Sequence, residues 1–228
     1  MKRMIVSVSA CLSFWLPGLM AGTDVKAFKE GTPKRDVSVY QVPWRCPAAL
    51  QIGCGSHAKP ILLELEQNPG VSEAWLNRQG TAVAVVWNPD AKRKARRIAE
   101  NTLKEGKASK MSGEERSKTL ADFESGKRWY RGADVDRLSE EEAGVIAARW
   151  VRRVQAKTTL AEEKAEGLRA ALTEGLKKCL TGKEAMPETK EAKALELGRA
   201  AKPFLDEKQL EILSEAAGCG MRAMPDEK

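Results

Sequence analysis

The sequence predicts an α+β protein made of two unlike halves. Up to about residue 106, short β-rich runs are interleaved with stretches whose apolar residues recur at helical spacing. From residue 138 onward, almost every stretch has apolar residues three and four positions apart, which is typical of amphipathic helices. We therefore expect a mixed domain at 37–106, a linker or partly helical connection at 107–137, an all-α domain at 138–220 and a short tail at 221–228.

The first 22 residues, "MKRMIVSVSACLSFWLPGLMAG", predict export. A short basic start precedes an apolar stretch, and small residues follow at Ala21 and Gly22, which is the order of a cleaved signal peptide. Pro17 and several polar residues make this stretch a poor continuous membrane span. Lipid attachment at Cys11 and an uncleaved anchor stay open as alternatives. Cleavage would leave a periplasmic or secreted protein with no stable membrane span.

The charge pattern argues against nucleic acid as a partner. The 39 Lys and Arg residues exceed the 32 Asp and Glu residues, giving a net charge of +7. In the second half the cations alternate with Glu, as on a solvated helix face. The denser run "AKRKARRIAENTLKEGKASK" lacks the aromatic residues of a surface that binds nucleic acid. No enzyme is expected either, since one histidine offers no choice of Ser-His-Asp set and no phosphate loop is present.

The elements of the first half are expected in the order β-α-β-β-α. The strand at Val37–Val42 is followed by a short apolar run and by the helical stretch "AKPILLELEQN", in which Pro60 suits a first turn. "VSEAWLN" and "TAVAVVW" predict two strands joined by a tight turn at Gly80. A second helix, with Asn88 or Asp90 as its cap, ends near Gly106. This is the split βαβ order. No clean fourth strand follows, so Val37–Val42 is expected at a sheet edge.

In the second half, three capped helices are expected. "SEEE" at residues 139–142 and "TLAE" at residues 159–162 have the form of capping boxes, and a last helix is capped by Asp206 with Gln209 and stopped at Gly218. Two apolar stripes follow the first two boxes and predict the core of an antiparallel helix pair. The stripes are Ala143, Ile146, Ala147, Trp150, Val151 and Val154, and then Ala161, Ala165, Leu168, Leu172, Leu176 and Cys179.

The stretch "QIGCGSHAKPILLELEQNPGV", residues 51–71, holds the single histidine, His57, three residues after Cys54. With the following "SEAWLNRQGTAVAVVW" it resembles the heavy-metal-associated domain over residues 46–105, because twelve residues separate His57 from the Pro of "PGV". The resemblance implies a ferredoxin-like βαββαβ fold with a metal loop, in which Cys54 and His57 match the two metal cysteines. The chain departs from that pattern in having His at the second position and no clean fourth strand.

A thiolate and an imidazole three residues apart at the start of a helix can converge on one ion. The N-terminus of a helix favours the thiolate form of a cysteine, which is the form that binds metal. This donor set suits Cu(I), Zn(II) or Hg(II). Two ligands are too few for a structural zinc site. The Gly-rich turn "GCGSH" is expected to be exposed, so capture, sensing or transfer of the ion is expected. Cys46 is a further candidate ligand.

Disulfides would change this interpretation. Export would leave four cysteines, and pairing within each half, Cys46 with Cys54 and Cys179 with Cys219, is the simplest arrangement. A disulfide at Cys54 would remove the thiolate. The protein would then be an envelope scaffold, built on a degenerate metal domain and stabilised by disulfides.

The second half has a weaker resemblance, carried by "FLDEKQLEIL" and the two capped helices. These stretches are similar to periplasmic helical-hairpin proteins that sense heavy metals or envelope stress. The resemblance implies an all-α helical-hairpin domain and an envelope protein as a partner. The tail "CGMRAMPDEK" adds Cys219, Met221 and Met224, sulfur side chains of a kind that can bind Cu(I).

Overall fold

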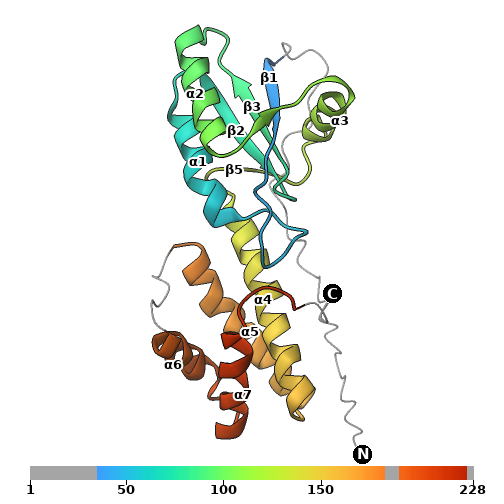
Figure 1. Ribbon diagram of the computed structural model, residues 1–228, viewed down its shortest axis with the longest axis vertical. Helices are drawn as coiled ribbons and strands as arrows, with labels where there is room; N and C mark the ends of the chain where they lie inside the picture. The colour runs from blue at the N-terminus through green and yellow to red at the C-terminus, as the bar shows by residue number, and fades with distance from the viewer. Residues whose placement is uncertain (1–34, 183–189, 225–228) are drawn as a thin grey trace, which may run out of the picture.

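The structure, a computed structural model, describes residues 35–182 and 190–224 (Figure 1). The predicted export segment, residues 1–22 with Cys11, lies outside the described residues. Within the described ranges the protein is a mixture of α and β, with seven helices and one five-stranded antiparallel sheet. None of the described helices combines the length and the apolar character needed to cross a bilayer.

The sheet has the strand order β4-β1-β3-β2-β5. β2 and β3 lie where the sequence predicts them, joined by a tight turn in which Gly80 has a φ of 67°. The expectation that the first strand lies at an edge is wrong, because β1 pairs with β3 on one side and with β4 on the other. β4 has only two residues, too few to show a period of two. The strands are β1 (Val37–Gln41), β2 (Val71–Asn77), β3 (Ala82–Trp87), β4 (Ser109–Lys110) and β5 (Trp129–Arg131).

Helices cover both faces of the sheet. α1 (Gly55–Gln67) and α2 (Arg93–Glu105) pack on one face, against buried side chains such as Val83 and Val85. α3 (Gly113–Glu124) packs on the other face, where Phe123 meets Ala84 and its neighbours. Segment 107–137, expected as a linker or partly helical connection, therefore carries β4, α3 and β5 and completes the sheet.

Two helix starts in the first half differ from expectation. α1 begins at Gly55, so Pro60 lies inside the helix and not in its first turn. The start is early because the backbone of Cys54 is fixed by a 2.7 Å hydrogen bond from its N–H to the Trp44 carbonyl, which holds the first turn in place. α2 has Lys92 at its N-cap, and Asn88 instead donates to the Pro69 carbonyl at 2.8 Å.

Two of the three predicted capping boxes are wrong. α4 (Asp136–Lys157) begins before Ser139, which is fully buried inside the helix, because turn hydrogen bonds starting at residues 134 and 135 already lead into it. α5 (Glu162–Leu180) is preceded by Ala161 as its N-cap, which makes no side-chain capping bond. The third box is confirmed. In α7 (Glu207–Gly218), Gln209 N–H donates to Asp206 Oδ1 at 2.8 Å, and the Asp206 N–H donates to Gln209 Oε1 at 3.1 Å.

One continuous core joins the sheet end to the helical end. α4 runs from the sheet to the other end of the molecule, where it lies beside α5 and α7, and α6 (Lys190–Ala201) packs against α5 and α7 (Figure 1). The buried cluster extends from Tyr40 in β1 to Leu213 in α7. The predicted stripe of α4 is buried throughout. In the second predicted stripe, Ala161 precedes α5 and is exposed, and Cys179 is only partly buried.

Candidate functional site

The predicted metal loop lies where the chain enters α1. Cys54 is the N-cap residue, and Gly53 forms an isolated antiparallel bridge with Arg45. The segment that flanks the loop is itself anchored, because Trp44 donates from Nε1 to the Gly106 carbonyl at 2.7 Å. The backbone of Cys54 is thus held on a fixed support between β1, α1 and the end of α2.

The two glycines of the loop are buried, although the loop was expected to be exposed. A Cβ on Gly53 would lie 2.9 Å from the Gly80 Cα, and one on Gly55 would lie 2.5 Å from Ser139 Oγ and 2.7 Å from the Val135 carbonyl oxygen. Only glycine permits this approach of backbones. The β2–β3 turn approaches Gly53, and α4 packs on the first turn of α1 at Gly55.

Cys54 and His57 both lie at the start of α1, at positions three apart that share one face of a helix. Cys54 is partly exposed, and its thiol makes no capping bond to the helix; its Sγ lies 3.5 Å from Ser56 Oγ. His57 is exposed, and its ring meets Trp44 edge to face, with 5.8 Å between the ring centroids. The structure therefore places both predicted ligands at the N-terminus of α1.

Cys46 is in a different environment from this pair. It is fully buried, and its Sγ accepts from the Ala48 N–H at 3.2 Å. Burial raises the pKa of Cys46 to about 12, and a hydrogen bond from the thiol to Glu142 adds to the shift. A thiol that keeps its proton is a poor metal ligand, since metal binds the thiolate.

The buried polar side chains of α4 are the residues that sequence reasoning missed. Burial raises the pKa of Glu142, and the hydrogen bond from Cys46 partly offsets this rise. Among the described residues, Glu142 Oε2 and Ser139 Oγ have no hydrogen-bond partner. Both residues are three or four positions from members of the apolar stripe, which places them on the buried face of α4. The sequence therefore contained a signal for their burial, but the same stretch, "SEEE", also matches a capping box.

Neither predicted disulfide is formed in the described part of the chain: Cys46 is not joined to Cys54, nor Cys179 to Cys219. The described residues also contain no group of three or more His, Cys, Asp or Glu side chains placed to hold a metal. Among the residues that the structure describes, the loop thus offers two ligands, and no other His, Cys, Asp or Glu is placed with them to form a group of three.

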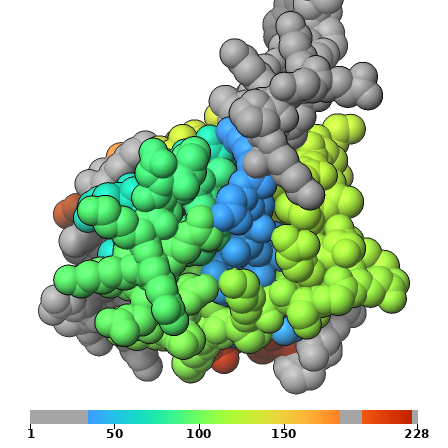
Figure 2. Space-filling model, turned by 90° about the horizontal axis from the view of Figure 1, so that it is seen from above, coloured from blue at the N-terminus to red at the C-terminus, as the bar shows by residue number. Residues whose placement is uncertain are grey.

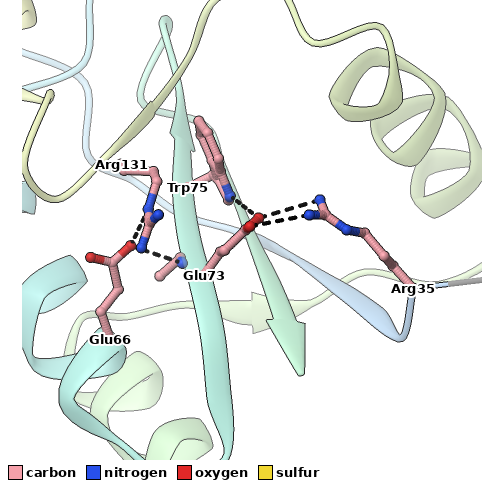
Figure 3. A network of polar contacts seen from close by, with 6 residues as sticks. Arg35, Glu66, Glu73, Trp75 and Arg131 are labelled. Carbon is pink, nitrogen blue, oxygen red and sulfur yellow. Dashed lines mark hydrogen bonds and ion pairs between the residues drawn. The ribbon is translucent and has the colours of Figure 1, made fainter. Parts of the chain in front are cut away.

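A second polar network fixes α1 and the start of the described chain to β2 (Figure 3). Glu66 accepts from Arg131 Nε at 2.8 Å and from the Ala74 N–H at 3.3 Å, so it ties α1 to β5 and β2. Glu73 accepts from Arg35 and, at 3.0 Å, from Trp75 Nε1. The hydrogen bond to Glu66 raises the pKa of Arg131. Each carboxylate is neutralised by an arginine, so the network holds elements together and offers no reactive group.

Comparisons with protein families, with curated proteins and with solved structures find no match for this chain.

Proposed function

We propose that the protein is exported and captures a soft or borderline metal ion, Cu(I), Zn(II) or Hg(II), through Cys54 and His57. The observation that supports this most is the placement of a partly exposed thiol and an exposed imidazole together at the N-terminus of α1. Neither side chain takes part in a salt bridge or a capping bond with any described residue.

The helix end contributes electrostatically to such a site. The first N–H groups of α1 have no partner within the helix, and the N-terminal end of a helix carries partial positive charge. Such a charge attracts anionic groups placed beside it. Sulfur and nitrogen donors suit the three ions named. A site with two protein ligands leaves positions open for a ligand from a second protein, which suits sensing or transfer.

The arrangement of the first six elements agrees with the fold that the sequence resemblance implies. We propose that β1, α1, β2, β3, α2 and β4 form a ferredoxin-like βαββαβ unit; the pairing order β4-β1-β3-β2 supports this. We also propose that α4 and α5, which pack along each other and are joined by a four-residue connection, form the helical hairpin.

The test is a competition titration of the reduced protein against a chromogenic chelator, with Cu(I) and with Zn(II). We expect one ion per chain, and an affinity that falls at least about tenfold, or about 1.4 kcal/mol, in Cys54→Ser and in His57→Ala. Cys179→Ser is the matched control, because it removes a partly buried thiol from α5, far along the chain from the loop. His57→Cys should tighten Cu(I) binding, since this ion prefers thiolate to imidazole.

Binding that is equal in the wild type, Cys54→Ser and His57→Ala would overturn the proposal. So would the absence of binding to the reduced wild type. The protein would then be better explained as an envelope scaffold whose metal domain is degenerate.

A further inference from the structure

The outer face of α2 is an exposed basic surface. The helix packs on the sheet through Ala99 and Leu103, which are buried. Its other side, with the residues that flank the helix, exposes six cations to solvent. They are Lys92, Arg93, Lys94, Arg97, Lys104 and Lys107, called the α2 basic surface below. In Figure 2 the green segment that includes α2 projects long side chains away from β1, which is blue.

The fold separates the charges of this helix into two groups. Arg96 is paired with Asp36 at 2.6 Å and lies over the Trp87 ring at 4.9 Å. Glu100 faces β1 and β4, within 3.5 Å of both the Tyr40 hydroxyl and Lys110 Nζ. These paired side chains face the sheet, whereas the six cations of the α2 basic surface form no ion pair with any described residue.

The acidic residues near the α2 basic surface do not neutralise it. The exposed acidic side chains there are Asp90, before the helix, Glu105, at its last position, and Glu64 of α1, which accepts from Thr102 Oγ1 at 3.0 Å; they are three against six cations. The sequence alone does not show this excess of positive charge, because Glu100 belongs to the same charged run; in the structure Glu100 faces β1 and β4 instead.

Ile98 lies on the same face, 50% exposed. Among the described residues, one other large apolar side chain is at least as exposed, Leu50 at 62%. Ile98 follows Lys94 by one helical turn and is adjacent in sequence to Arg97. The surface thus combines dense positive charge with a single protruding aliphatic group.

We propose that the α2 basic surface binds the anionic surface of a phospholipid bilayer. Lys and Arg near such a surface are attracted to its head groups, and each strengthens binding about fivefold. Their aliphatic stems can lie along the interface while the charged ends stay in water. Ile98 would enter the apolar boundary between the cations, as the apolar residues of interfacial helices do.

Two other classes of partner fit this surface less well. Single-stranded nucleic acid is bound by aromatic side chains that stack on the bases, but Trp87 and Tyr40 beside α2 are buried. Protein interfaces depend on a well-packed centre of aromatic and arginine side chains that excludes water. The α2 basic surface has one aliphatic group among unpaired cations, which a fluid anionic surface accommodates better.

The experiment is co-sedimentation of the full protein with vesicles at low ionic strength. Vesicles of phosphatidylcholine and phosphatidylglycerol in equal parts should bind it, and vesicles of phosphatidylcholine should not. Added salt should weaken the binding, since it screens exposed charges. The double variant Arg93→Gln with Arg97→Gln should bind about 25-fold more weakly, from about fivefold for each cation. Ile98→Asn should also weaken it.

The matched control is Arg152→Gln with Lys164→Gln, which removes two exposed cations from the helical end and changes the net charge equally. It should bind as the wild type does, and circular dichroism should show that all variants are folded. Equal loss in both double variants would overturn the proposal in favour of an effect of net charge. Binding to a DNA oligonucleotide or to polyglutamate, with none to anionic vesicles, would overturn it in favour of those partners.

Discussion

Glu142 is a carboxyl group buried between α4 and the loop that follows β1, with the Cys46 thiol as a hydrogen-bond donor. Burial raises its pKa above the ordinary value of 4.5, since the charged form loses its hydration. At pH values between 4.5 and the raised pKa in the folded protein, the folded protein binds more protons at Glu142 than the unfolded chain does. The contribution of Glu142 to stability is therefore full below pH 4.5 and is lost as the pH rises through the folded pKa.

Glu142→Gln should remove this dependence. The amide has no charge to bury, so the stability of the variant relative to the wild type should increase from about pH 4.5 toward neutral pH, by at most about 1.4 kcal/mol per pH unit. Urea unfolding at a series of pH values measures it. Glu141→Gln is the control, because Glu141 is partly exposed and paired with Arg78 at 2.6 Å. A stability difference for Glu142→Gln that does not change with pH would contradict the assignment.

The site was predictable only in part at this scale. The spacing of Cys54 and His57 ahead of a helical stretch placed both at a helix N-terminus, because that inference needs local sequence alone. The burial of Gly55 and the contact between Cys46 and Glu142 depend on α4, which docks from a distant part of the chain. No local pattern specifies that contact, so the loop was expected to be exposed.

The β2–β3 hairpin depends on glycine for two reasons at once. Gly80 has a φ of 67°, and a Cβ there would lie 2.4 Å from the Trp44 carbonyl oxygen. Gly80→Ala should therefore cost about 2–4 kcal/mol, from backbone strain and overpacking together. Gly113→Ala separates the two causes, because Gly113 has a φ of 60° and a Cβ there would have no described atom within 4 Å. It should cost about 1 kcal/mol. Equal losses in chemical denaturation would contradict the role of the Trp44 contact.

The capping boxes predicted for α4 and α7 have similar sequences, but only the box of α7 is formed. Asp206 accepts from the Gln209 N–H, so Asp206→Ala should destabilise the protein by roughly 0.5–2 kcal/mol. Ser139 is buried inside α4, and its hydroxyl has no hydrogen-bond partner among the described residues, so Ser139→Ala should be neutral or slightly stabilising. Thermal unfolding of both variants provides the comparison. If Ser139→Ala costs as much as Asp206→Ala, the position of Ser139 inside α4 is wrong.

The main elements of the molecule were predictable, but the way they join was not. β2, β3 and the buried stripe of α4 have clear periods of two and of three to four residues, and they lie where the sequence predicts them. β4 and β5 have two and three residues, too few to show any period, yet they form both edges of the sheet. The predicted boundary at residue 138 falls inside α4, because side chains of this helix are buried in the core at both the sheet end and the helical end of the molecule.

This shared helix predicts that the whole protein unfolds in one transition. Leu138 in α4 is fully buried in the cluster that also contains Ile52 of the sheet end and Leu213 of α7. Tryptophan fluorescence reports mainly on the sheet end, where Trp44, Trp75, Trp87 and Trp129 lie, and far-ultraviolet circular dichroism reports mainly on the long helices. The two signals should change at the same urea concentration, as a two-state transition requires.

Leu138→Ala should lower the free energy of unfolding by about 2–5 kcal/mol and shift both signals together, whereas Leu50→Ala, at an exposed position, should change it little. Two separate transitions, or a shift of one signal without the other, would show that the two ends unfold independently.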